Sequence, residues 1–357
     1  MSLGEMDQSK AEAFGGRMVG LLNDAMLGLM LSVGHRTELF DVMAAMGPGT
    51  SAEIAERAGL DERYVREWLN AMTVGRIVDH DGAASTYVLP AEHAAFLSRA
   101  AGPNNLAGLA QNVSLMGDVE DEIVECFRNG GGVPYSKYPK FQQLMADTSA
   151  EVHDASLVDG ILPMVDGMIE RLHSGIDVCD VGCGQGHAVN LMAAAFPASR
   201  FTGLDFSEEG IAAGRREAAD KGLKNATFEV HDIAALDDSM QFDLITAFDC
   251  IHDQADPAKV LHNIAQAVRP DGAFLCVDVA GSSTVDRNMD LPLGPTLYSV
   301  STFHCMTVSL AQGGAGLGTM WGEELANEML RDAGFTDVET KKIPEDFFNV
   351  YYVARKG

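Results

Sequence analysis

The chain has 357 residues, of which 46% are hydrophobic, and its formal net charge is −27 at pH 7. This length suggests two domains with buried cores, and the hydrophobic content excludes an intrinsically disordered protein. The negative charge argues against a nucleic-acid partner or an anionic membrane surface, because both require clustered Lys and Arg.

The six cysteines include no C-x-x-C pair, which favours free thiols in a reducing cytoplasm. The first ten residues are polar and acidic and do not have the pattern of a signal peptide, in agreement with a cytoplasmic protein. Cys179 and Cys183 are possible metal ligands by residue type, but they flank a strand end and a glycine-rich turn. We therefore predict no metal site.

The first predicted element is an apolar helix at residues 18–33. Its surface is apolar around most of its circumference, so it must be covered on several sides. A second copy of the chain is a natural cover and predicts a homodimer, with a core helix inside one chain as the alternative. The segment has only 16 residues and contains Asn23 and Asp24, so we expect it to be too short to span a bilayer.

Two capped helices at residues 50–61 and 64–72, followed by a hairpin at residues 76–89, form the next unit. This pattern resembles a winged helix. Winged helices that bind DNA need basic side chains, whereas the first hundred residues carry eight Lys and Arg against fourteen Asp and Glu. The wing tip, residues 79–81, reads Asp-His-Asp, so DNA binding is disfavoured.

A connector follows, in which Gly130, Gly131 and Gly132 predict a flexible joint. The aromatic residues in 133–141 could then form a lid over a ligand site or anchor a loop to the core, and the sequence leaves both open. A helix at residues 151–173 is expected to lead into the next domain.

A buried strand beginning at Ile176 ends in a turn with Gly182, Gly184 and Gly186, and residues 188–196 read as a helix. Glycines allow positive φ and close approach of a ligand, and a helix N-terminus favours negative charge. His187 stands where a dinucleotide-binding turn would place its third glycine, which weakens an NAD interpretation.

Three more strands are predicted before residue 250. Asp180, Asp205 and Asp232 fall at or near the ends of successive strands. Open α/β sheets bind their ligands at the carboxyl ends of the strands, so we expect these carboxylates at one edge.

The order of these motifs resembles class I S-adenosylmethionine (SAM) methyltransferases over roughly residues 170 to 355. The resemblance implies that the glycines lie under the methionine and ribose, that Asp205 binds the ribose hydroxyls, and that Asp232 and Ile233 bind the adenine. The cofactor-binding residues that it implies are Asp180, Gly182, Gly184, Gly186, Asp205, Phe206, Asp232, Ile233 and Phe248.

The fold that the resemblance implies is α/β, a Rossmann-like sheet of seven strands with a terminal antiparallel hairpin after an α-rich winged-helix-like domain. We expect a dimerisation domain at 1–100, a helical connector or lid at 101–165 and the SAM-binding domain at 166–357. In many O-methyltransferases the winged helix serves dimerisation and closes part of the substrate site, and the resemblance implies the same here.

Residues 251–256, Ile-His-Asp-Gln-Ala-Asp, are similar to the Leu-His-Asp-Trp-x-Asp pattern of plant and polyketide O-methyltransferases, with Gln254 in place of Trp. The resemblance implies that His252 is the general base and that Asp278, at the end of the fifth strand, orients it. A hydroxyl acceptor must lose its proton, and a histidine with a pKa near neutrality can take it. A second carboxylate of the family, expected shortly before Trp321, has no match.

A long insertion at residues 280–320 is expected to carry substrate specificity on loops. His304 is an alternative base. Cys305 invites thiol chemistry, which we disfavour because no third member of a triad is evident in the sequence. A helix at 322–330 and strands at 338–343 and 348–353 complete the predicted sheet.

We therefore predict a SAM-dependent methyltransferase that acts on a small molecule, at oxygen in preference to nitrogen or carbon, and releases S-adenosylhomocysteine. Methylation of nitrogen or carbon in the same pocket is the alternative among enzymes. A SAM-sensing winged-helix transcriptional regulator without turnover and an NAD-dependent oxidoreductase are the alternatives from other classes.

Overall fold

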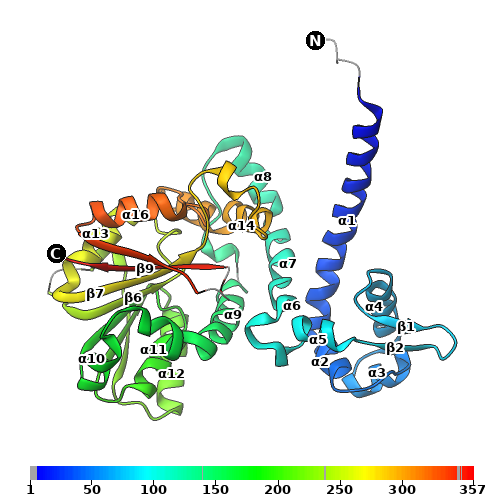
Figure 1. Cartoon of the computed structure of the whole chain (residues 1–357), viewed down its shortest axis with the longest axis horizontal. Coiled ribbons are helices and arrows are strands. Elements are labelled where there is room, and N and C mark those ends of the chain that lie inside the picture. Colours follow the sequence, from blue (N-terminus) through cyan, green and yellow to red (C-terminus); the bar gives the residue numbers. More distant parts are fainter. Residues whose placement is uncertain (1–5, 139, 237–238, 344–345, 347) are drawn as a thin grey trace. The chain divides into compact units, whose positions relative to one another are not determined.

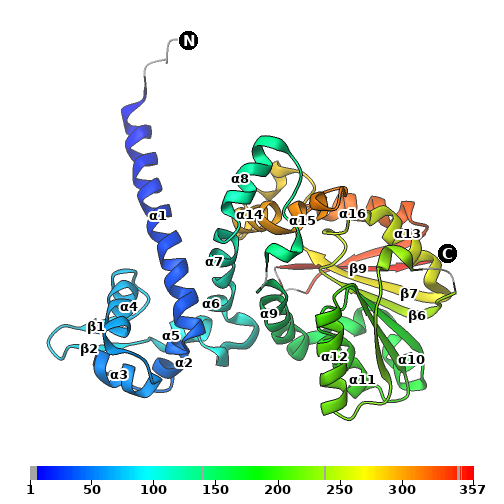
Figure 2. The same cartoon turned by 180° about the vertical axis from the view of Figure 1, so that it is seen from behind.

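The computed structural model of the chain describes residues 6–138, 140–236, 239–343, 346 and 348–357. The chain divides into two compact units, Met1–Asp118 and Val119–Gly357. Figures 1 and 2 show the elements of each unit from two sides.

The first unit begins with a single long helix, α1 (Gln8–Arg36). The Asp7 carboxylate caps it by accepting the backbone N–H groups of Ser9 and Lys10. With 29 residues, α1 is longer than the predicted apolar segment, because the helix formers before residue 18 extend it. The predicted length was therefore wrong. Among the described residues, α1 is the one helix long and apolar enough to cross a membrane by length and composition.

The winged helix follows α1. Its elements are α2 (Leu39–Ala44), α3 (Ser51–Ala58), α4 (Glu62–Val74), β1 (Asp79–Asp81) and β2 (Thr86–Val88). The sequence predicts a capped helix here, and Thr50 and Glu53 form a reciprocal capping box at the start of α3. Trp68 packs edge-on against Phe40 and donates its indole N–H to the carbonyl oxygen of Met30 at 2.9 Å. The unit ends with α5 (Ala91–Leu97), η1 (Arg99–Asn104), α6 (Leu106–Leu109) and α7 (Gln111–Gly117).

The second unit is built on a sheet of seven strands in the order β5-β4-β3-β6-β7-β9-β8. β9 runs antiparallel to β7 and β8, and the other pairings are parallel, so the terminal hairpin is confirmed. The strands are β3 (Asp177–Val181), β4 (Arg200–Asp205), β5 (Ala226–Val230), β6 (Phe242–Phe248), β7 (Val268–Val279), β8 (Asp337–Lys341) and β9 (Asn349–Arg355).

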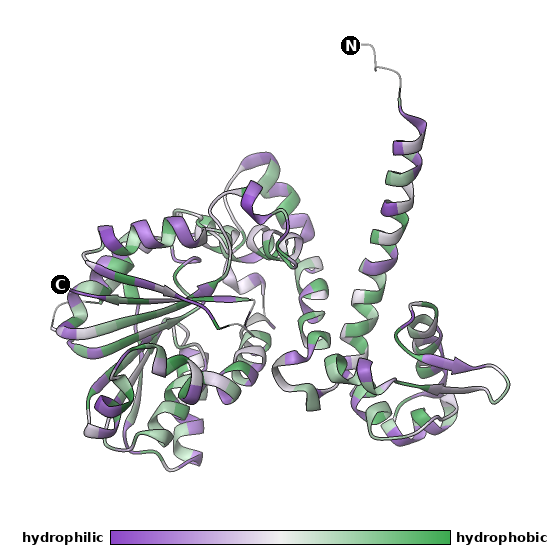
Figure 3. Ribbon diagram, viewed as in Figure 1, coloured by the Kyte–Doolittle hydropathy of each residue, from purple (hydrophilic) through white to green (hydrophobic). Residues whose placement is uncertain are grey.

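Helices cover both faces of this sheet (Figure 1). One core packs α10 (Met168–Ser174), α11 (His187–Ala195) and α12 (Glu208–Asp220) on one face. The other core packs α13 (Pro257–Ala267) and α16 (Gly322–Asp332) on the opposite face. The central strands are largely hydrophobic along their length (Figure 3), as expected for strands that are buried on both sides. The predicted fold class is confirmed.

The connector departs from the predicted single helix at residues 151–173. After α8 (Glu120–Asn129) and η2 (Tyr135–Lys137), the chain forms α9 (Phe141–Ser156), η3 (Leu157–Ile161) and η4 (Leu162–Met164) before α10. After Pro163 the backbone becomes extended at Val165, and Gly167, with a φ of 71°, then stands at the start of α10. Most of this stretch is helical, but the prediction of one continuous helix was wrong.

The insertion at 280–320 is helical rather than a long loop. It contains η6 (Val285–Asn288), α14 (Gly294–Val300), the π-helical turn η7 (Ser301–Cys305) and α15 (Met306–Ala311). Thr307 and Val308 of α15 are buried. The prediction of loops was wrong because the helical pattern is short and broken by glycines.

Candidate functional site

The glycine-rich turn after β3 uses its three glycines in two different ways. All three have positive φ, 69° at Gly182, 54° at Gly184 and 74° at Gly186. A Cβ on Gly182 would lie 2.7 Å from Cys250, and one on Gly186 would lie 2.2 Å from the ring of Phe228. A Cβ on Gly184 would meet nothing within 4 Å. Two glycines therefore pack the turn onto the sheet, and Gly184 borders open space.

Asp205, at the end of β4, is tied to this turn. Its carboxylate accepts the backbone N–H of Gly184 at 2.9 Å and that of Ser207 at 2.8 Å. Burial raises the pKa of Asp205, and these two hydrogen bonds oppose the rise. Each carboxylate oxygen keeps a second acceptor position, as required for a group that binds ribose hydroxyls. The open space at Gly184 and this carboxylate together fit an adenosyl cofactor.

Asp180 is the least exposed of the three strand-end carboxylates, at 2%. It accepts a hydrogen bond from the Thr246 hydroxyl on β6 at 2.6 Å. Burial raises its pKa to about 7, and the charge of Asp205 adds to the rise. Asp180 therefore lies under the turn and beside Asp205, as expected from the order of the strands.

The residues predicted to bind adenine, Asp232 and Ile233, lie after β5, and Phe206, also predicted to bind the cofactor, lies directly after β4. Asp232 caps the short turn η5 (Ile233–Ala235) by accepting the N–H of Ala234 at 2.9 Å, and Ile233 is buried. Phe206 is 56% exposed, with its ring centroid 5.5 Å from that of Tyr135. These side chains leave an exposed aromatic face beside the Asp205 carboxylate.

Helix α9 is held to the same turn through His187. The His187 ring nitrogens lie 2.8 Å from a carboxylate oxygen of Glu217 on α12 and 3.0 Å from one of Asp154 on α9. On the same helix, the ring of His153 packs edge-on against Phe248 at 4.7 Å. His187, whose size argues against a dinucleotide-binding turn, therefore connects α9, α11 and α12 around the site.

His252 and Asp278 form a buried dyad, although they are 26 residues apart in the chain. His252 Nδ1 lies 2.7 Å from Asp278 Oδ1, and the two residues are 4% and 0% exposed. They meet because β6 and β7 are neighbouring parallel strands that end together. Burial alone would lower the pKa of His252, but the Asp278 carboxylate and the Cys305 side chain raise it well above its ordinary value.

The dyad lies directly beside the glycine-rich turn. Cys250, two residues before His252, donates its thiol proton to the carbonyl oxygen of Val181 at 3.1 Å. Because a Cβ at position 182 would lie only 2.7 Å from this cysteine, only glycine fits there. The turn after β3 and the histidine after β6 therefore border one site.

His304 lies close to the dyad but in a different environment. It is completely buried, and its ring packs edge-on between Tyr135 at 5.3 Å and Tyr138 at 4.9 Å. Burial lowers its pKa to about 3, and the charge of His252 contributes. It is therefore held neutral near neutral pH, and its role as an alternative base stays a prediction.

The segment that follows the three glycines is anchored to α15. The sequence alone left open whether it forms a lid or an anchor. A Cβ on Gly132 would lie 2.0 Å from the carbonyl oxygen of Thr307, so this glycine packs directly against α15. The N–H of Val133 donates to the Thr307 hydroxyl at 2.8 Å. The Tyr138 hydroxyl donates to the carbonyl of Phe303, and that of Tyr135 donates to the carboxylate of Asp253. These contacts favour the anchor over the mobile lid.

Tyr135 is a site residue that the motifs did not single out. It contacts Asp253, beside the dyad, and Phe206, beside Asp205. Burial together with the charge of Asp253 raises the pKa of its hydroxyl. In the sequence, only the aromatic residues in 133–141, after the three glycines, suggested a residue near the ligand site.

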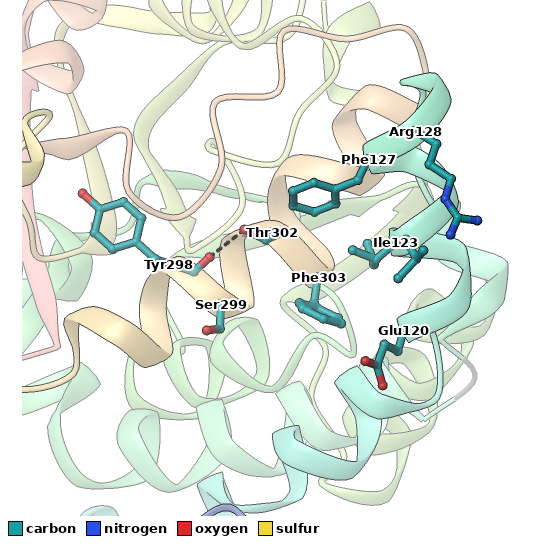
Figure 4. Close-up of a pocket in the computed structure, with 9 residues that line it drawn as sticks. Glu120, Ile123, Phe127, Arg128, Tyr298, Ser299, Thr302 and Phe303 are labelled. Carbon is teal, nitrogen blue, oxygen red and sulfur yellow. Dashed lines mark hydrogen bonds between the residues drawn. The ribbon is translucent and has the colours of Figure 1, made fainter. Parts of the chain in front are cut away.

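A cavity of about 520 Å³ lies between α8 and the α14–η7 segment (Figure 4). Its aromatic lining residues are Phe127, Tyr298 and Phe303, and Thr302 donates its hydroxyl to the carbonyl of Tyr298 at 2.9 Å. None of the predicted site residues lines this cavity, whose lining consists of Glu120, Ile123, Val124, Phe127, Arg128, Tyr298, Ser299, Thr302 and Phe303. Within the described part of the chain, no group of three or more His, Cys, Asp or Glu side chains could hold a metal ion.

Two family models match the chain. Residues 25–99 match an Rv2258c-like winged HTH domain, and residues 172–334 match a methyltransferase domain.

Among curated proteins, malonyl-(acyl-carrier protein) O-methyltransferase of Bacillus cereus is 27% identical over 149 residues, which cover 41% of this chain and 49% of that protein. Ubiquinone biosynthesis O-methyltransferase of Salmonella paratyphi A is 32% identical over 135 residues, which cover 36% and 51%. The chain therefore spans about half the length of the curated relatives it matches.

The solved structures that resemble the chain extend over both units. Human N-acetylserotonin methyltransferase in complex with SAM has a TM-score of 0.70 and 18% identity, with 99% of each chain covered. An O-methyltransferase family protein from Burkholderia thailandensis has a TM-score of 0.68 and 16% identity, with 96% of this chain and 98% of that chain covered. At these identities the likeness shows the fold. The chain thus matches a winged HTH domain at residues 25–99 and a methyltransferase domain at residues 172–334, and it has the fold of solved methyltransferases.

Proposed function

We propose that this chain transfers the methyl group of SAM to an oxygen atom of a small molecule, with His252 as the general base. The observation that carries the proposal is the buried pair of His252 and Asp278, 2.7 Å apart, beside the glycine-rich turn. Neither binding nor sensing of SAM requires such a pair, whereas deprotonation of a hydroxyl does.

The cofactor end of the site would be formed by Gly184, Asp205 and Phe206. The Asp205 carboxylate would accept the ribose hydroxyls, and the absence of a side chain at Gly184 would leave room for the cofactor. When bound, SAM supplies an electrophilic methyl group on a sulfonium. Because the reaction is an in-line displacement, much of the rate comes from holding the acceptor oxygen in line with that methyl group.

The acceptor end would be formed by the dyad. Asp278 accepts the Nδ1–H of His252, which leaves the Nε2 lone pair for the proton of the acceptor hydroxyl. As that proton arrives, the imidazolium is stabilised by the Asp278 carboxylate. The pair thus removes one proton and leaves the acceptor oxygen free to attack.

The pH dependence of methyl transfer should follow His252. Only the neutral imidazole accepts a proton, so kcat/KM should rise with pH and level off above the pKa of His252. Because Asp278 and Cys305 raise this pKa, the midpoint should lie above about 6.5. In Asp278→Asn the effect of burial dominates, so the midpoint should move to lower pH while the plateau falls. A wild-type midpoint at or below 6.5, in a pH profile of kcat/KM, would contradict this assignment.

A homodimer through α1 is part of the proposal. Phe14, Leu21, Leu22 and Met26 on this helix are each more than half exposed, at 60%, 57%, 61% and 62%. An apolar surface of this kind on a soluble chain favours a protein partner. Sedimentation equilibrium should give a dimer for the wild type and a weaker dimer for Leu22→Asp. A monomeric wild type would rule out this interface.

We further propose that the protein works in the cytoplasm. All six cysteines are free, as expected in a reducing compartment.

Binding of the cofactor tests the proposal independently of the acceptor. S-adenosylhomocysteine should raise the melting temperature of the protein, because a ligand that binds only the folded state stabilises it. NADH at the same concentration should have no effect. Stabilisation by NADH and not by S-adenosylhomocysteine would refute the proposal and support an oxidoreductase.

A further inference from the structure

His187, the first residue of α11, pairs with carboxylates on two other helices through both nitrogens of its ring. Its Nδ1 lies 2.8 Å from Glu217 Oε1 on α12, and its Nε2 lies 3.0 Å from Asp154 Oδ1 on α9. A neutral imidazole has one N–H and cannot donate to two carboxylates, whereas an imidazolium donates from both nitrogens. The arrangement is therefore complete when His187 is charged.

The two carboxylates that His187 contacts are held to different degrees. Glu217 also pairs with the Lys221 ammonium at 2.7 Å and accepts the Asn190 amide at 3.0 Å. The side chain of Asp154 is 60% exposed, against 27% for Glu217, and its carboxylate has His187 as its one polar partner among the described residues. His187 is thus fixed on the α12 side and holds α9 on the other.

The contact at Asp154 sets the rotation of α9 about its own axis. Successive residues of a helix point about 100° apart, so a helix held at Asp154 places its neighbour His153 in one direction. The His153 ring packs edge-on against Phe248, with the ring centroids 4.7 Å apart. Burial lowers the pKa of His153 to about 4, and the charge of His187 contributes. His153 therefore packs on Phe248 as an uncharged ring near neutral pH.

Helix α9 also contacts the glycine-rich turn itself. Gln185 in this turn donates its side-chain amide to the side-chain oxygen of Gln143 on α9 at 3.4 Å. Gly184, the preceding residue, borders the open space that we assign to the cofactor, and Phe248 ends the strand next to β3. Helix α9 lies against α11, which begins directly after the turn (Figure 1). The helix that His187 holds therefore borders the proposed cofactor site.

We propose that His187 is a positioning residue for the cofactor. By holding Asp154 it fixes the rotation of α9, and α9 in turn places His153 against the Phe248 ring at the edge of the cofactor site. His187 touches neither the dyad nor the acceptor side, so its effect is on cofactor affinity. This role rests on the proposed function, because it requires SAM to bind beside Gly184 and Phe248.

The test compares S-adenosylhomocysteine binding by the full chain and by Asp154→Ala in calorimetric titrations. Asp154 is exposed, so the melting temperature without ligand should change by less than about 2 °C. The dissociation constant should rise at least about threefold, because α9 loses the charged contact that orients His153. The matched control is Asp159→Ala, which removes the same charge from an exposed position of η3, directly after α9, and should bind like the wild type.

A double substitution separates positioning from a general loosening of the protein. In a Phe248→Leu background, Asp154→Ala should weaken binding no further, because the ring that α9 positions is already gone. Asp154→Glu should restore most of the affinity, since it keeps the carboxylate that pairs with His187.

Wild-type affinity in folded Asp154→Ala, or the same loss of affinity in the Phe248→Leu background, would overturn the positioning role. A lower melting temperature with unchanged affinity would likewise make the His187 contacts merely structural. Failure of the wild type to bind S-adenosylhomocysteine would overturn the proposed function together with this role, whereas unchanged affinity in Asp154→Ala overturns the role alone.

Discussion

Replacement of His252 by alanine is expected to lower kcat for methyl transfer by about a hundredfold to ten-thousandfold, the range typical of a lost general base. The loss should appear in kcat because proton removal belongs to the chemical step and the cofactor residues stay in place. Binding of S-adenosylhomocysteine, measured by calorimetry, should change by less than about threefold. His252 contacts Asp278, and no cofactor-binding residue that we propose depends on it.

The control for this variant is His262→Ala on the exposed side of α13, which should keep full activity. Because His252 is buried, its removal leaves a cavity and an unpaired Asp278, so the melting temperature must be recorded for each variant. A folded His252→Ala protein that keeps wild-type kcat would exclude His252 as the base. His304 would then be the remaining candidate for the general base.

Replacement of Gly184 by asparagine is expected to weaken S-adenosylhomocysteine binding at least tenfold, equivalent to about 1.4 kcal/mol. Gly184 has a φ of 54°, a conformation that asparagine tolerates better than other residues with a side chain. A side chain there would enter space that is open in the protein and that we assign to the cofactor. The protein should therefore fold normally and lose its ligand.

Gly222→Asn is the matched control for Gly184→Asn. Gly222 has a φ of 68° and also has nothing within 4 Å of its Cβ position, but it follows α12, away from the strand ends. Both substitutions therefore carry the same backbone strain, and only one places a side chain in the proposed site. Equal affinities in calorimetric titrations of the two variants would contradict the placement of the cofactor at Gly184.

The sheet and the arrangement of the site could be predicted because their signals are local. Runs of apolar residues that end in Asp or Gly marked β3, β4 and β6, and parallel strands bring such ends to one edge. The family resemblance implied that Asp278, near the end of the fifth strand, orients His252, and the structure brings the two side chains to 2.7 Å. Their catalytic roles stay predictions.

The features that could not be predicted depend on packing between distant segments. Three consecutive glycines favour a flexible joint, yet Gly132 is fixed by the backbone of α15, far along the chain. Likewise, the packing of His304 between Tyr135 and Tyr138 depends on the path of the insertion, whose helices have weak sequence signals. The break between α9 and α10 reflects one proline and one glycine in an otherwise periodic stretch.

The most direct test of the account is transfer of labelled methyl from SAM into the small molecules of a cell extract, measured with the wild type and His252→Ala. We predict a labelled small-molecule product with the wild type and little or none with the variant, at equal SAM binding. SAM binding without any labelled product would contradict the catalytic role and favour a SAM sensor. If SAM does not bind at all, the assignment of the glycine-rich turn and Asp205 as a cofactor site is wrong.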